Sequence, residues 1–209
     1  MKRKLLGILL LGFASGLPYM LVFSTLTAWL RDVGISLTEI GFFAWLVLTY
    51  SLKFLWAPFV DRYSIPGFVV FGKRRGWILF SQLIIFLSLI GMSFIDPLKN
   101  IQLLALFAFF AAFFGSIQDV AVDALRIEIG DAKEQGDLAA SYQLGYRVAI
   151  LVATSMALIF ADLYNWSYVY QFMGFLMLLG SAGALICYEP TNHEIAILRF
   201  DEALLGAFK

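Results

Sequence analysis

Charged residues are scarce in this sequence, and their scarcity indicates the class of protein. Of the 209 residues, 14% are Asp, Glu, Lys or Arg, whereas 61% are hydrophobic, and the mean hydropathy is +0.84. Soluble domains carry about 25% charged and about 45–50% apolar residues, so the composition alone indicates a membrane protein. The formal net charge is zero, which removes the electrostatic basis for binding nucleic acid.

Cysteine, histidine and catalytic motifs are equally sparse. Cys187 is the single cysteine, so no disulfide can form within the chain. His193, the single histidine, follows the last apolar run in a polar stretch, where a solvated side chain is a better interpretation than a ligand. No metal-ligand spacing, phosphate-binding loop or nucleophile elbow occurs. We therefore expect no metal, no cofactor and no enzymatic activity.

Apolar runs long enough to cross a bilayer, at about 20 residues per span, recur along the chain. They cover residues 5–30, 37–60, 77–95, 101–125, 140–161 and 166–188. The intervening segments carry Gly, Pro, Asn or Asp and are too short for a soluble domain. The first run is too long for a signal peptide and has no cleavage site, so we interpret it as a retained span. The sequence predicts an all-α, polytopic bundle over residues 1–188 and a short amphipathic helix over the tail, residues 189–209.

The distribution of lysine and arginine predicts the orientation of these spans. One side of the membrane receives most of the positive charge, at Lys2, Arg3, Lys4, Arg62, Lys73, Arg74, Arg75, Arg126 and Lys133. The other side receives Arg31 and Lys99. Positive loops stay inside, so both termini are expected in the cytoplasm.

Four ionisable residues fall inside the predicted spans: Lys53, Asp119, Asp123 and Arg147. Counting at about 1.5 Å per residue puts Lys53, Asp119 and Arg147 roughly 10–12 Å from the cytoplasmic end, with Asp123 about one turn nearer to it. Charge inside a membrane is costly unless it is paired or hydrated. Two bases and two acids at similar depth predict a neutral cluster, which either fastens three helices together or lines a hydrated cavity.

Other polar residues favour the cavity interpretation. In the first span Ser15, Tyr19 and Thr27 fall near one face, and Pro18 is able to kink the helix. Gln118 and Tyr146 add hydrogen-bonding groups to the fourth and fifth spans.

Several stretches together resemble one family, the AmpG-type muropeptide permeases of the major facilitator superfamily. They are LKFLWAPFVDRY (residues 52–63), GKRRGW (72–77), SIQDVAVDA (116–124) and LGYR (144–147), with GFASGLPY near the start and YEP at the end. The resemblance covers almost the whole chain. Acetyl-CoA transporters are similar in outline and form the alternative within the superfamily.

The resemblance implies the N-terminal six-helix half of a proton-coupled permease that imports anhydro-muropeptides across a bacterial inner membrane. Asp119 or Asp123 would take the proton, and Lys53 and Arg147 would hold acid groups of the substrate or lock the carboxylates. Tyr19, Gln118 and Tyr146 would bind its sugar or peptide groups. The resemblance also implies a cytoplasmic gating loop, in which Ala57 replaces the usual leading Gly. Its residues are Asp61, Arg62, Gly72, Lys73, Arg74 and Arg75.

Two alternatives remain open. The superfamily has two six-span halves, so this chain needs a second half or a homodimer, or it is a split or truncated remnant that does not transport. The spacing Gly115-x-x-x-Asp119-x-x-x-Asp123 also coincides with the end of the CDP-alcohol phosphotransferase motif. That motif requires Asp-Gly-x-x-Ala-Arg upstream, and its absence here disfavours a membrane phosphotransferase.

Overall fold

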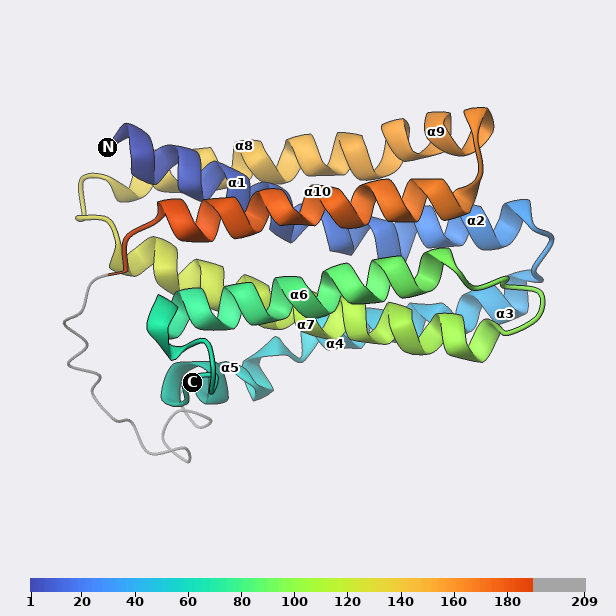
Figure 1. Cartoon of the computed structure of the whole chain (residues 1–209), viewed down its shortest axis with the longest axis horizontal. Coiled ribbons are helices and arrows are strands. Elements are labelled where there is room, and N and C mark those ends of the chain that lie inside the picture. The colour runs from blue at the N-terminus through green and yellow to red at the C-terminus, as the bar shows by residue number, and fades with distance from the viewer. Residues whose placement is uncertain (190–209) are drawn as a thin grey trace.

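Six long helical stretches lie side by side and alternate in direction (Figure 1). The computed structural model describes residues 1–189, and this part of the chain contains helices and no β-strand. The expected all-α bundle with six helices long and apolar enough to cross a membrane is confirmed. The predicted tail helix, over residues 189–209, lies outside the described residues except for Glu189.

The first, second and fifth stretches are divided into shorter elements, whereas the third, fourth and sixth are continuous helices. In chain order these are α1 (Lys2–Met20), η1 (Leu21–Thr25) and α2 (Leu26–Asp32); α3 (Leu37–Phe42), η2 (Phe43–Leu46), α4 (Val47–Ser51), η3 (Lys53–Leu55) and α5 (Ala57–Arg62); η4 (Val69–Phe71) and α6 (Lys73–Ser93); α7 (Ile101–Glu128); α8 (Gln135–Leu151), η5 (Val152–Met156) and α9 (Ala157–Leu163); and α10 (Trp166–Ile186).

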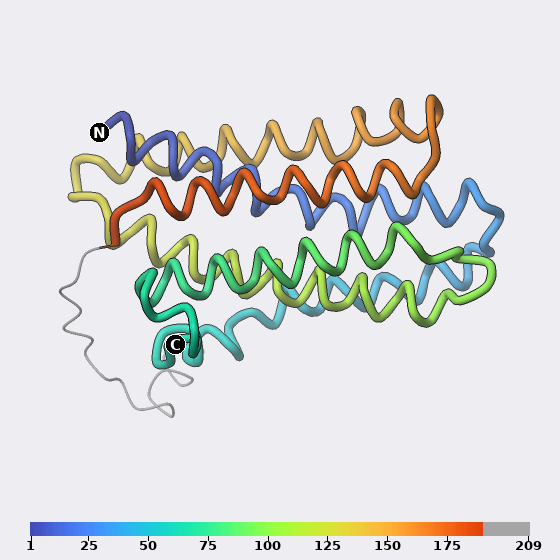
Figure 2. The backbone as a smooth tube through the Cα atoms, viewed as in Figure 1, coloured from blue at the N-terminus to red at the C-terminus, as the bar shows by residue number. Residues whose placement is uncertain are grey.

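One end of the bundle carries the N-terminus, the start of α6, the end of α7, the start of α8 and the end of α10 (Figure 2). Because most of the lysine and arginine belongs to these termini and the loops between them, we call it the basic end. Its residues are Lys2, Arg3, Lys4, Arg62, Lys73, Arg74, Arg75, Arg126 and Lys133.

The second stretch, predicted as one run over residues 37–60, is broken. Short α-helices alternate with 3₁₀ turns, and Leu52 and Trp56 lie in turns on either side of η3. Pro58 contributes to the break because it has no N–H to continue the hydrogen bonding of the preceding turn, whereas in the first turn of α5 that N–H is not needed. Backbone groups freed at such breaks must be satisfied by protein or by water.

The first and fifth stretches each contain one π-helical segment, η1 and η5, and the two segments contact each other. The Thr25 hydroxyl donates a hydrogen bond to the Ala153 carbonyl across this contact. π-Helical turns are rare in proteins, and those that do occur are often located at functional sites.

Helix α1 occupies the centre of the bundle, between α8 and α10. Its close approach to α8 depends on glycine. A Cβ at Gly12 would collide with the Tyr142 carbonyl, and a Cβ at Gly145 would collide with the Leu9 carbonyl. Small residues at helix interfaces allow backbones to approach in this way inside membranes. Gly16 continues the same contact, with Tyr146 against it.

We predict that Gly145→Ala destabilises the bundle by about 1–3 kcal/mol, because the new methyl group forces α8 away from α1. Gly136, also on α8, is the matched control, since a Cβ there meets nothing within 4 Å. Gly136→Ala should be neutral, or stabilising by about 0.4–1 kcal/mol. Unfolding free energies in detergent test this, and equal stability of the two variants would contradict the close approach.

Candidate functional site

Asp119 of α7 is an acidic residue in the interior of the bundle. It lies nine residues before Glu128, the last residue of α7, which places it roughly 13–14 Å along the helix from the basic end. Its Oδ1 atom is buried and has no hydrogen-bond partner within residues 1–189. The Ser15 side chain of α1 lies beside the carboxylate, although its Oγ also lacks a partner with full hydrogen-bond geometry. The Asp119 Oδ1 is therefore buried although the residue as a whole is half-buried, and no ion pair within residues 1–189 neutralises the carboxylate.

Tyrosines from two other stretches surround this carboxylate. Tyr50 of α4 and Tyr142 and Tyr146 of α8 are all close enough to interact electrostatically with Asp119. The Tyr50 hydroxyl is buried without a partner and lies against Gly115, one turn before Asp119.

Aromatic contacts connect these tyrosines to the first stretch and to each other. The ring of Tyr50 packs edge-on against Tyr19, with centroids 5.0 Å apart. The rings of Tyr142 and Tyr146 lie one helical turn apart, with centroids at 6.2 Å. We call the set the Asp119 cluster. It consists of Ser15, Tyr19, Tyr50, Lys53, Asp119, Tyr142 and Tyr146.

The four membrane charges do not form the expected neutral cluster. Lys53 and Asp123 are near enough to act on the charge of Asp119, yet Lys53 makes no ion pair with any residue from 1 to 189. Asp123 pairs instead with Arg126 at 3.7 Å, on the same helix.

Arg147 is exposed and has no ion pair in the described part of the chain. The reason lies in the register of α8, which turns Gly145 and Ala149 toward α1. Arg147 stands two residues from each, roughly 200° around the helix, and points away from that interface.

Gln118 is fully buried, and neither of its side-chain amide atoms has a partner among residues 1–189. It is therefore covered rather than presented to a ligand. Tyr19 and Tyr146 are half-buried. Of the predicted site residues, the structure thus brings together Tyr19, Lys53, Asp119 and Tyr146, with Asp123 nearby and Arg147 apart.

Sequence reasoning missed Tyr50 and Tyr142. Tyr142 carried a usable signal, since it stands four residues before Tyr146 and shares its helix face. Tyr50 carried none, because the broken second stretch gives no regular face from which to predict its direction.

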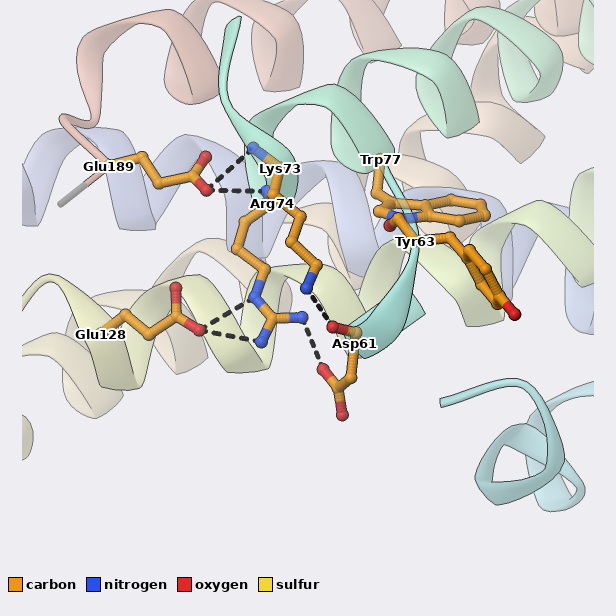
Figure 3. Close-up of polar contacts among 7 residues, drawn as sticks. All are labelled: Asp61, Tyr63, Lys73, Arg74, Trp77, Glu128 and Glu189. Atoms are coloured by element: carbon orange, nitrogen blue, oxygen red, sulfur yellow. Dashed lines mark hydrogen bonds and ion pairs between the residues drawn. The ribbon is translucent and has the colours of Figure 1, made fainter. Parts of the chain in front are cut away.

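A second polar site, at the basic end, connects three helices through Arg74 (Figure 3). Arg74 Nη1 lies 2.5 Å from Asp61 Oδ1 of α5, and its Nε and Nη2 both lie 2.9 Å from Glu128 Oε1 of α7. The Arg74 side chain is 9% exposed. Lys73 adds a hydrogen bond from Nζ to the Asp61 carbonyl.

Glu189 completes this site by capping α6. Its carboxylate accepts hydrogen bonds from the backbone N–H groups of Lys73, Arg74 and Arg75, at 2.9, 3.0 and 3.1 Å. Gly72 is required here, because its φ is 102° and a Cβ would collide with the Glu189 carboxylate. We call Asp61, Lys73, Arg74, Glu128 and Glu189 the basic-end network.

The basic-end network includes only part of the predicted gating loop. Asp61, Gly72, Lys73 and Arg74 belong to it or shape it, and Arg75 contributes its backbone N–H. Arg62 is exposed and lies 6.0 Å from the centroid of the Tyr63 ring. Sequence reasoning missed Glu128 and Glu189, although the unpaired N–H groups at the start of α6 require an acceptor.

Neither site has the composition of a metal centre. Within residues 1–189, no group of three or more His, Cys, Asp or Glu side chains lies together.

Comparisons with known proteins identify relatives of this chain. The chain is 39% identical over 186 residues to the anhydromuropeptide permease of Escherichia coli K12. The aligned residues make up 88% of this chain and 37% of the permease. It is 36% identical over 213 residues to a transporter of Rickettsia typhi designated AmpG 3, covering 97% of this chain and 51% of the relative. The chain thus spans about half or less of the length of these relatives.

The profile of the major facilitator superfamily matches residues 8–203, nearly the whole chain. Together with the relatives, this match confirms the resemblance seen in the sequence motifs. The chain belongs to the major facilitator superfamily, and its relatives are permeases of the AmpG type.

Proposed function

We propose that this chain forms half of a proton-coupled permease that imports anhydro-muropeptides across a bacterial inner membrane. The superfamily match and the AmpG-type relatives support a transport role rather than catalysis. The E. coli relative is named for anhydromuropeptide, which supports that substrate class. The distribution of lysine and arginine supports cytoplasmic termini, so the basic end faces the cytoplasm.

The observation that carries the proposal is the half-buried Asp119, whose Oδ1 is buried without a partner and whose carboxylate has no ion pair within residues 1–189. An ionisable group is tolerated inside a membrane when it is neutralised by a proton, meets a counter-charge or faces water. Such groups mark proton and substrate pathways. Protonation of Asp119 removes a negative charge that acts on Lys53. The Lys53 ammonium is then free to hold an acid group of the substrate. The neighbouring tyrosine hydroxyls are suited to hydrogen-bond both the ionised and the protonated Asp119 side chain, because a hydroxyl donates as well as accepts.

The remaining predicted residues have secondary roles in this proposal. Arg147, exposed on α8, is available to a carboxylate of the muropeptide peptide. Tyr19 and Tyr146 offer hydroxyls to sugar or peptide groups. Gln118 has to be uncovered by helix movement before it contacts substrate, and Asp123 is the alternative proton acceptor.

The burial of the six stretches supports a partner that covers one side of the bundle. In the most apolar 18 residues of the second and fifth stretches, 17% and 22% of the residues are buried, whereas in the first stretch 67% are buried. Superfamily transporters place their substrate between two six-span halves that rock against each other. A second six-span half, or a second copy of this chain, would cover these two stretches. The alternatives are a split remnant without transport activity and half of an acetyl-CoA-type transporter.

Asp119→Asn tests the coupling role directly. The amide keeps the shape of the side chain but cannot exchange a proton, so we expect uptake to lose its dependence on an imposed pH gradient. Stability should be unchanged or raised by up to about 1 kcal/mol, since a neutral group costs less to bury.

Uptake of labelled anhydro-muropeptide is measured in membrane vesicles that contain the chain alone or with a second six-span half. Asp162→Asn, at an exposed position on α9, is the control. Unchanged pH-dependent uptake in Asp119→Asn would remove Asp119 from the coupling role. Absence of uptake by the unsubstituted chain with its second half would reject the permease itself.

We further propose that the basic-end network is the cytoplasmic latch of the permease, because Arg74 holds α5 and α7 together. Arg74→Gln leaves Glu128 without this partner, and we expect a loss of about 1–3 kcal/mol in unfolding free energy. This is less than the 3–5 kcal/mol of a fully buried pair, since the Asp61 side chain is 52% exposed.

Arg62→Gln is the matched control, since it removes an arginine from the same loop outside the network. Its stability should stay within about 0.5 kcal/mol of the unsubstituted protein. Denaturant unfolding in detergent compares the two variants, and similar losses in both would exclude a specific role for Arg74.

A further inference from the structure

A groove runs along the outer surface between α6 and α10, in the half of the bundle nearer the basic end. Its volume is about 270 Å³. Aromatic and aliphatic side chains line it: Phe68, Phe71, Leu79, Leu83, Phe86, Leu178, Ser181 and Leu185. The Ser181 hydroxyl, the one polar group in this lining, donates to Gln82 Oε1 at 2.6 Å and is already satisfied. The groove therefore offers a ligand only apolar contacts along its length.

The groove faces the region that lipid occupies. Leu83, Leu178 and Leu185 are each about half exposed, at 45%, 48% and 48%. A membrane protein exposes such side chains to acyl chains rather than to water, since lipid tails are as apolar as leucine.

Arg75 stands at the basic end of this groove. Along α6 it shares a helix face with Leu79, Leu83 and Phe86, at offsets of four, eight and eleven residues. The charge of Arg75 also acts on the thiol of Cys187, one residue past the end of α10. Arg75 thus stands near the ends of both helices that form the groove.

The charge of Arg75 is not neutralised by the basic-end network. Its neighbour Arg74 pairs with Asp61 and Glu128, whereas the bond of Arg75 to Glu189 comes from its backbone N–H. The half-buried Arg75 side chain has no ion pair within residues 1–189, and its buried Nε has no hydrogen-bond partner there. A partly desolvated guanidinium without a counter-charge fits a carboxylate or phosphate, which it binds through two parallel hydrogen bonds.

The distance from this charge to the far end of the groove matches one leaflet of a bilayer. Eleven residues from Arg75 to Phe86 span roughly 16–17 Å of helix, and half of a hydrocarbon core of about 30 Å is about 15 Å. An acyl chain that lies in the groove would therefore have its head group at the level of Arg75.

We propose that this groove binds an anionic phospholipid of the cytoplasmic leaflet, with one acyl chain between α6 and α10 and the phosphate on the Arg75 guanidinium. The lipid would join the ends of α6 and α10 beside the basic-end network. The lipid site does not depend on what the chain transports.

Lipid binding is tested on the full chain purified in detergent, by native mass spectrometry with added phosphatidylglycerol. We expect Arg75→Gln to retain about tenfold less phosphatidylglycerol than the unsubstituted protein, because charge-assisted hydrogen bonds to the phosphate are lost. Arg62→Gln, which removes an exposed arginine of the same end, should retain it fully. Equal loss in both variants, or no loss in either, would overturn the site.

A second pair of variants tests the groove without altering charge. Leu83→Trp fills it and should reduce phosphatidylglycerol retention, whereas Leu87→Trp, 51% exposed on the same helix but outside the lining, should not.

Two further outcomes would also overturn the proposal. They are equal retention of phosphatidylethanolamine, which carries no net charge, and displacement of the lipid by soluble glycerol phosphate, which has no acyl chain.

Discussion

The arrangement of the bundle depends on the contact between the backbones of α1 and α8. Gly12, Gly16 and Gly145 allow this contact, because a Cβ at any of them would meet a backbone or side-chain atom of the other helix. It places α1 at the centre of the bundle, and it brings Tyr142 and Tyr146 to the side of α1 that carries Ser15 and Tyr19. The surroundings of Asp119 are thus a consequence of helix packing, and the glycines determine which polar groups meet the carboxylate.

Within that arrangement the two polar sites differ in how their charges are compensated. At the basic end, Arg74 meets two carboxylates and Glu189 meets three N–H groups, so charge and hydrogen-bonding capacity are matched. In the interior, Asp119 has hydroxyl groups around it but no ion pair among residues 1–189. Matched charge stabilises a structure in one state, whereas a single unpaired carboxylate makes the free energy of a conformation depend on its protonation.

The sequence was sufficient for the class of fold and for part of the interior site. Long apolar runs are decisive because a bilayer requires about 20 apolar residues per helix, and Asp119 was recognisable because charge is rare in such runs. The broken second stretch and the π-helical turns were not predictable, since they depend on contacts such as Thr25 with Ala153. Arg147 was placed by depth alone, and depth does not determine on which side of a helix a residue lies. Glu189 was recognised only as part of the YEP motif, and its role was missed because its partners are backbone groups, which the sequence does not identify.

The least buried stretches are also the ones whose side chains lie near Asp119. Tyr50 and Lys53 belong to the second stretch, and Tyr142 and Tyr146 belong to the fifth, the two stretches with the lowest burial. Helix α6 packs against both α7 and α10, and at the basic end it is fastened to α7 by Arg74 and capped by Glu189 just beyond α10. The fifth stretch is held to the centre of the bundle by the close contact of α8 with α1, so its low burial reflects an exposed outer face rather than loose packing. In a transporter built from two such halves, the exposed faces of the second and fifth stretches, next to Asp119, would be covered by the second half.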